Sequence, residues 1–219
     1  MELNFLSHRI WRRFRFYGRK IFSLAFAYVC GKRYRAVIFV LLFILGLFLV
    51  IPPGKPLFTD SYSTVIEDKE GRFLRVFLNE NDQWFLPPKT ADTIPFKLKQ
   101  AVVYFEDEYF KYHPGVNPVS LVRAAYQNIK SGKVVSGAST ITMQVARLRN
   151  PKKRNYFSKF LEMLDAVRLE CHYSKQEILK LYLNHAPYGG NIIGYQAASH
   201  KYFGKSPRKL TWGEAATLA

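Results

Sequence analysis

The chain has few cysteines and no repetitive sequence. Its 219 residues include only two cysteines, Cys30 and Cys171. This number excludes a disulfide framework, and no spacing typical of a cysteine-based metal site is present. Internal repeats and low-complexity tracts are also absent. The length predicts one modest domain with an appendage.

Acidic residues are scarce. The chain has 16 Asp and Glu against 33 Lys and Arg, which gives a formal net charge of +17. Such an excess favours an anionic partner: nucleic acid, phospholipid headgroups or a phosphorylated substrate. A GxxxxGK[ST] phosphate-binding loop is not found, so the sequence does not indicate a nucleotide-binding protein of that class.

In the N-terminal quarter of the chain, a basic segment is followed by an apolar segment. Residues 1–35 carry one acid, Glu2, and many basic residues, and residues 36–51 then carry no charge at all. As a helix this apolar run would be about 24 Å long, somewhat shorter than a bilayer core of ~30 Å. A cleaved signal peptide and a buried core helix are the alternatives, but the long basic lead and the uniform apolarity favour a retained anchor.

We therefore expect a basic cytoplasmic tail at residues 1–35 and a transmembrane anchor at residues 36–53. Basic residues before the span predict that the N-terminus lies in the cytoplasm and that the rest of the chain lies outside it. This topology argues against nucleic acid as the partner. An anionic lipid-linked substrate fits both the charge and the anchor.

The remaining sequence predicts a small β element followed by helices. Residues 54–95 form a linker and a β-hairpin, with the turn at Asp68-Lys69-Glu70-Gly71. Helical patterns begin at Phe96 and continue to residue 219, and Ser174 and Thr211 each open a capping box. The fold class is therefore mainly α, and residues 96–219 are one domain.

Three adjacent acids lie between aromatic residues at Glu106, Asp107 and Glu108. If the helix runs from Phe96 to Phe110, Glu106 falls between two apolar patches, whereas Asp107 and Glu108 point to the sides. Loss of water around a carboxyl group favours its neutral form, so Glu106 is the candidate for proton transfer. The alternative is that all three are solvated, and Asp107 and Glu108 are expected to be charge partners of nearby Lys and Arg.

A basic stretch without acids runs from Lys133 to Lys159. Its hydroxyl, amide and guanidinium groups suit a phosphate or pyrophosphate with polar sugars. Further on, Lys159 and Glu162 share one helix face, opposite a predicted apolar stripe that begins with Phe157 and Phe160. Taken alone, this pair is typical of a surface ion pair.

Four motifs in order resemble the family 51 peptidoglycan glycosyltransferases, the transglycosylase domains of class A penicillin-binding proteins, in particular the 1C type. The first is EDEYFKYHPG, the second GASTITMQ, the third Arg154 with SKFLE, and the fourth KQEILKLYLN with Tyr188-Gly189. The resemblance covers roughly residues 61–219. It implies a lysozyme-like fold and the polymerisation of lipid II into glycan strands, with release of undecaprenyl pyrophosphate.

The resemblance also implies site residues. Glu106 would be the catalytic base and Glu162 would assist at the pyrophosphate, directly or through a divalent cation, Mg or Mn. No cofactor is required and no protein metal site is expected. The remaining substrate-binding positions are Ser139, Thr140, Gln144, Arg147, Arg154 and Lys159.

Two departures from the family pattern qualify these expectations. Ser158 stands where the third motif has arginine, and a fifth basic motif and a transpeptidase domain are not found, so we expect a C-terminally incomplete glycosyltransferase domain without transpeptidase activity. The alternatives are a non-catalytic lipid II-binding membrane protein and a lysozyme-like lytic enzyme. The expected partners are lipid II, the growing glycan, the bacterial cytoplasmic membrane and other cell wall synthesis proteins.

Overall fold

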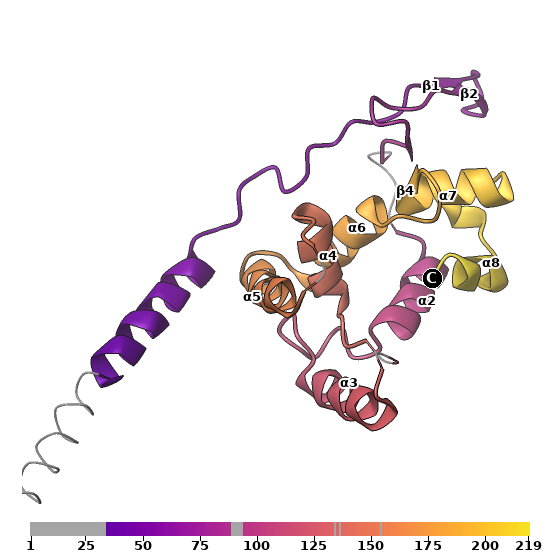
Figure 1. Cartoon of the computed structure of the whole chain (residues 1–219). Helices are drawn as coiled ribbons and strands as arrows, with labels where there is room; N and C mark the ends of the chain where they lie inside the picture. Colours follow the sequence, from indigo (N-terminus) through magenta and orange to yellow (C-terminus); the bar gives the residue numbers. More distant parts are fainter. Residues whose placement is uncertain (1–33, 89–93, 134, 136, 154) are drawn as a thin grey trace, which may run out of the picture. The chain divides into compact units, whose positions relative to one another are not determined.

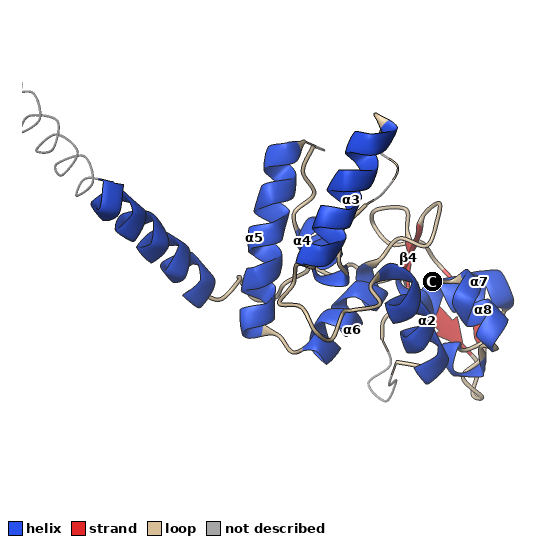
Figure 2. Cartoon of the chain, turned by 90° about the horizontal axis from the view of Figure 1, so that it is seen from below, coloured by secondary structure: helices blue, strands red, loops and turns tan. Residues whose placement is uncertain are grey.

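A computed structural model describes residues 34–88, 94–133, 135, 137–153 and 155–219. Contacts divide the chain into two units, residues 1–51 and residues 52–219. The second unit is mainly helical with short strands, as Figure 2 shows. The predicted fold class, mainly α with a small β element, is confirmed for this unit.

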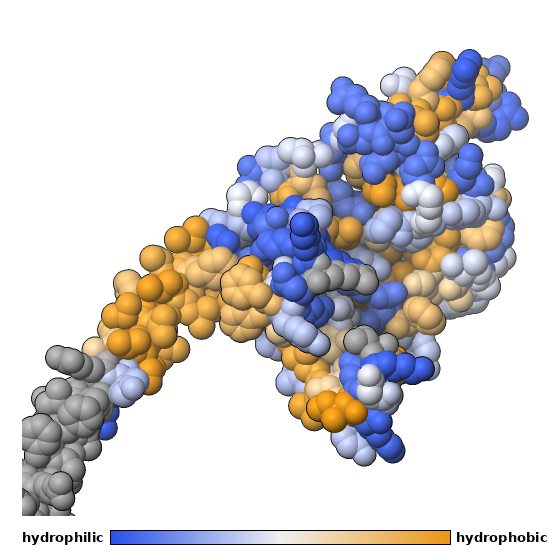
Figure 3. Space-filling view, viewed as in Figure 1, coloured by the Kyte–Doolittle hydropathy of each residue, from blue (hydrophilic) through white to orange (hydrophobic). Residues whose placement is uncertain are grey.

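The first unit contains a helix over residues 34–50, whose apolar side chains are exposed (Figure 3). Among the described residues, no helix is both long enough and apolar enough to cross a membrane. This search does not find the anchor predicted at residues 36–53, and the basic tail predicted at residues 1–35 lies outside the described residues except for residues 34 and 35.

The second unit begins with the predicted hairpin. Strands β1 (Val65–Glu67) and β2 (Phe73–Val76) pair antiparallel, and the turn between them is closed by the side chain of Asp68. Gly71 has φ +76°, a conformation that glycine adopts without strain. A second small sheet pairs β3 (Trp84–Phe85) with β4 (Ile192–Ile193) in parallel.

Helices form the rest of the unit (Figure 1). Their bounds are α2 Phe96–Glu106, α3 Pro118–Ser131, α4 Ile141–Arg149, α5 Tyr156–His172, α6 Lys175–His185, α7 Gly194–Phe203, the 3-10 helix η1 Pro207–Lys209 and α8 Trp212–Thr217. Both predicted capping boxes are present, at Ser174 and Thr211. Each box satisfies backbone N–H groups at the helix start, which explains why α6 and α8 begin where the sequence predicts.

The hydrophobic core lies where α4 and α6 meet their neighbours. α4 packs against α5 and α6, α6 packs against α7, and α2 packs against α8. The centre is built from fully buried aliphatic side chains, among them Leu98, Ile141, Val145, Ile178 and Leu183. Helix α2 contributes Leu98 and Val102 to the same core as α4, and the candidate site lies at the C-terminal end of α2.

Candidate active site

Helix α2 ends earlier than the sequence predicts. Glu106 is its last residue, and the chain leaves the helix at Asp107, with φ −160° and ψ 76°. The predicted extension to Phe110 is therefore wrong. The helical wheel no longer applies beyond Glu106, and Tyr109 is 54% exposed. Phe105 lies within the helix and is nevertheless 76% exposed.

Asp107 is buried, which corrects its prediction as a solvated charge partner. Both carboxylate oxygens lie 3.0 Å from Nε2 of His113, and Oδ2 accepts a hydrogen bond of 3.1 Å from the Ile141 N–H group. The abrupt end of α2 turns this side chain inward. Asp107 thereby joins three segments: the end of α2, the turn at His113 and the start of α4.

The turn at His113 has a structural role. His113 is buried against Asp107, and its carbonyl oxygen accepts a hydrogen bond of 2.7 Å from Nζ of Lys175. Gly115 follows with φ +88°, and a Cβ atom there would lie 2.7 Å from the carbonyl oxygen of Ala166 on α5. The turn therefore packs so closely on α5 that only glycine fits.

The start of α4 brings a predicted amide to the predicted base. Thr140 caps α4 by accepting the Met143 N–H group, and its hydroxyl donates to the Gly115 carbonyl. With this end of α4 held, Nε2 of Gln144 donates a hydrogen bond of 2.6 Å to Oε2 of Glu106. Glu106 and Gln144, 38 residues apart in the sequence, are thus in direct contact.

Glu106 lines a polar cavity of about 230 Å³. The cavity lies between the end of α2, the start of α3 and residues 137–140, so Ser139 and Thr140 share it with Glu106. Arg123 on α3 lines the same cavity and was not predicted. No sequence signal marked it, because α3 reads as an ordinary amphipathic helix until its neighbours are known.

Lys159 and Glu162 adjoin this cavity through Ser139. Nζ of Lys159 donates to Oγ of Ser139 and lies 3.4 Å from Oε2 of Glu162. The Glu162 side chain is only 12% exposed, whereas Phe157 and Phe160 are 69% and 51% exposed. The predicted faces of this part of α5 are therefore exchanged, because the Ser139 loop lies against the charged face.

Two tyrosines near Glu106, the buried Tyr182 and the partly buried Tyr188, were not predicted as site residues. Burial raises the pKa of Tyr182, and the negative charge of Glu106 raises it further while Arg147 opposes this effect. Burial likewise raises the pKa of Tyr188, with smaller contributions from Tyr182, Tyr195 and Glu106. Both phenols therefore stay neutral at physiological pH, so their hydroxyl groups remain hydrogen-bond donors.

Two predictions concern other positions. Arg154, a predicted diphosphate ligand, lies outside the described residues. Arg147 lies on α4, partly buried, within electrostatic range of Tyr182. Across the described parts of the chain, no group of three or more His, Cys, Asp or Glu side chains could hold a metal ion.

Most of the chain is similar to known proteins. The transglycosylase family model matches residues 70–219. Penicillin-binding protein 1C of Escherichia coli is 45% identical over 164 residues, 75% of this chain and 21% of that protein. Penicillin-binding protein 1F of Bacillus subtilis is 36% identical over 158 residues, 72% of this chain and 22% of that protein.

A third relative, penicillin-binding protein 1A of Aquifex aeolicus, is 34% identical over 182 residues, 82% of this chain and 24% of that protein. The chain thus spans about a fifth to a quarter of the length of these relatives. The family model nevertheless covers well over half of this chain, including Glu106, Gln144 and Lys159. On this basis, the chain belongs to the transglycosylase family.

Proposed function

We propose that this protein is a peptidoglycan glycosyltransferase that polymerises lipid II into glycan strands and releases undecaprenyl pyrophosphate. One observation carries the proposal: Glu106, in contact with Gln144, lines the same cavity as Ser139, and Lys159 is hydrogen-bonded to Ser139. A carboxylate at the cavity and a cation bonded to its wall suit a reaction in which a hydroxyl group loses a proton and a diphosphate leaves.

Glu106 is the general base in this mechanism. Its carboxylate takes the proton from the 4-hydroxyl group of the acceptor sugar, and that oxygen forms a bond to C1 of the growing chain. The bond between C1 and the pyrophosphate oxygen breaks, and its electron pair leaves with the lipid pyrophosphate. Gln144 holds one carboxylate oxygen through the hydrogen bond of 2.6 Å, so the carboxylate stays oriented toward the cavity.

Positive charge stabilises the leaving diphosphate. Lys159 lies beside Ser139 at the cavity, and we propose Arg147 on α4 and Arg154, which precedes α5 in the sequence, as further ligands of the diphosphate. Glu162 is a carboxylate of the type that binds Mg²⁺ together with substrate phosphates, which fits a cation that arrives with the diphosphate. Such a cation would neutralise charge on the leaving group, with Glu162 as its ligand from the protein.

A lipid-linked substrate implies a place at the membrane. Helix α3 exposes an apolar stripe at Val119, Val122, Tyr126 and Ile129, each between 65% and 82% exposed. The spacing puts these side chains on one helix face, which contributes to the hydrophobic surface in Figure 3. We infer that this face contacts the outer leaflet of the bacterial cytoplasmic membrane, with the basic N-terminal segment on the cytoplasmic side and the catalytic unit outside.

The products of the reaction test this function. Detergent-solubilised full-length protein is incubated with labelled lipid II, and the products are separated by size. We expect glycan polymer from the parent and from Glu70→Gln, in which an exposed carboxylate of the hairpin turn is changed, and none from Glu106→Gln. Cleavage of purified peptidoglycan without polymer would instead identify a lytic enzyme, and no product of either kind would contradict catalysis.

A further inference from the structure

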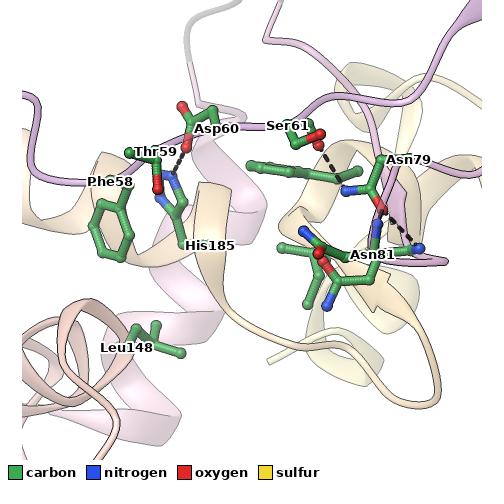
Figure 4. Close-up of a pocket in the computed structure, with 11 residues that line it drawn as sticks. Phe58, Thr59, Asp60, Ser61, Asn79, Asn81, Leu148 and His185 are labelled. Atoms are coloured by element: carbon green, nitrogen blue, oxygen red, sulfur yellow. Dashed lines mark hydrogen bonds and ion pairs between the residues drawn. The ribbon is translucent and has the colours of Figure 1, made fainter.

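A second cavity of about 190 Å³ lies apart from the Glu106 cavity (Figure 4). It is enclosed by residues 58–61, by the turn at residues 79–83, and by the C-terminal ends of α4 and α6. Leu148 comes from α4 and His185 from α6, as the close-up shows. The mechanism proposed above uses none of the residues that line this cavity.

The charges in this cavity compensate each other. Oδ1 of Asp60 lies 2.9 Å from Nε2 of His185, and the other carboxylate oxygen accepts a hydrogen bond of 2.5 Å from the Tyr62 hydroxyl. Burial raises the pKa of Tyr62, and its contact with Asp60 adds to the shift, so this phenol remains a donor. Nδ1 of His185 lies 2.8 Å from the Leu181 carbonyl, so both ring nitrogens are engaged.

The described residues that line the cavity include no lysine or arginine. Asp60 and His185 are its only charged or readily charged side chains, and they bind each other. The cavity therefore offers no unpaired charge to a phosphate, a carboxylate or an amine. This composition selects a neutral ligand, in contrast to the Glu106 cavity, where Arg123 contributes to the wall.

Side-chain amides give the cavity its hydrogen-bonding capacity. Nδ2 of Asn79 donates to the Ser61 carbonyl and Oδ1 accepts the N–H groups of Asn81 and Gln83, which fixes the turn. The contacts of Asn81 and Gln83 with Asn79 use only their backbone N–H groups. Within the described residues neither of these two side chains makes a hydrogen bond, so each can donate and accept.

An apolar surface completes the cavity. Phe85, Leu148 and Ile193 line it beside the amides, and the ring of Phe58 stacks on that of His185 at 3.8 Å between centroids. A pyranose ring has hydroxyl groups at its edge and apolar C–H groups on its face. Free amides next to apolar and aromatic side chains, without net charge, match both features of such a ring.

We propose that this cavity binds a neutral N-acetylhexosamine unit of a glycan strand. The inference rests on the proposed function, which supplies glycan at the neighbouring site. Leu148 follows Gln144 by one turn of α4, about 6 Å along the helix axis. His185 similarly follows Tyr182 by three residues on α6. The cavity thus lies about one helical turn from the groups around Glu106, where it can hold a sugar beyond the reacting one.

The experiment measures direct binding rather than catalysis. The full chain, labelled with ¹⁵N in detergent micelles, is titrated with a β-1,4-linked tetramer of N-acetylglucosamine. We expect the side-chain amide signals of Asn81 and Gln83 to shift, and the double substitution Asn81→Ala with Gln83→Ala to weaken binding about tenfold, as expected for two lost hydrogen bonds of ~0.5–1.5 kcal/mol each. Gln176→Ala, at an exposed amide on α6, is the matched control and should bind like the parent.

Three comparisons make the result decisive. Glu106→Gln should bind the tetramer like the parent, which separates this site from the catalytic one. N-acetylglucosamine 1-phosphate should shift the two amide signals less than the neutral sugar does. The proposal would be overturned if the Asn81 and Gln83 amide signals did not shift at millimolar tetramer, or if Gln176→Ala weakened tetramer binding as much as the double substitution does. Lipid II polymerisation by the same protein would still leave the proposed function intact.

Discussion

Replacement of Asp107 by alanine should be among the most damaging single changes near the site. The Asp107 carboxylate is 4% exposed, faces Nε2 of His113 at 3.0 Å and accepts the Ile141 N–H group at 3.1 Å. A hydrogen bond to a charged group contributes ~1.5–3 kcal/mol, and alanine leaves both partners buried without one. The free energy of unfolding should therefore fall by about 3–6 kcal/mol.

Unfolding of the full-length protein in urea, followed by tryptophan fluorescence, measures this loss. Asp107→Asn keeps an acceptor for the Ile141 N–H group and should lose about half as much. The matched control is Glu108→Ala, an exposed carboxylate next in the chain, whose effect should stay within about 0.5 kcal/mol. A loss under about 1 kcal/mol for Asp107→Ala would refute the idea that this side chain joins α2, the His113 turn and α4.

Three further predictions follow from other contacts. Gln144→Ala removes the hydrogen bond to Glu106 and should lower lipid II turnover about 10- to 100-fold without a matching loss of stability; unchanged turnover would contradict the contact. Gly115→Ala should lower the free energy of unfolding by about 2–4 kcal/mol, since φ is +88° and the new Cβ would clash with α5; a thermal melt at the parent temperature would refute this. The pKa of Glu214 is lowered from 4.5 to about 2 by hydrogen bonds from Lys205 and the Thr211 N–H group. A carboxyl group whose pKa is lower in the folded state stabilises the fold at pH values above its ordinary pKa. The difference in the free energy of unfolding between the parent and Glu214→Gln should therefore be full above pH 4.5 and vanish as the pH approaches about 2. A difference that stays constant with pH would be the contrary result.

Local sequence signals predicted the hairpin and the starts of α2, α6 and α8. The side chains of Ser174, Thr211 and Asn117 each accept a hydrogen bond from their own helix, so a short stretch of sequence contains the whole cap. The hairpin turn likewise depends on Asp68 and Gly71, which lie within four residues. Features that are complete within a few residues are therefore readable without a structure.

Features that depend on distant segments were not predicted correctly. Asp107 is buried because His113 and the N-terminus of α4 come to it, and no pattern within α2 encodes those partners. The reversed faces of α5 have the same cause, since Ser139 lies against Lys159. The helical wheel assumes that apolar residues point inward, and this assumption fails where apolar side chains such as Phe157 are exposed.

The choice of Glu106 as the proposed base could be made from the residues only in part. Helical spacing separated Glu106 from its two acidic neighbours, but the resemblance to known motifs was needed to assign it a role. Neither argument predicted that Glu106 contacts Gln144, which lies 38 residues away in the sequence, although both residues were named. Arg123 and Tyr182 were missed because each reads as an ordinary helix residue until the tertiary structure places it near Glu106.

The rate of lipid II polymerisation by Glu106→Gln tests the central claim most directly. Glutamine keeps the size of the side chain but accepts a proton far more weakly, so fold and substrate binding should persist while proton removal does not. General base catalysis contributes about 10²–10⁴-fold, so the rate should fall by that factor relative to the parent, with an unchanged unfolding midpoint. A Glu106→Gln protein that polymerises lipid II within about twofold of the parent rate would contradict the assignment of Glu106 as the base.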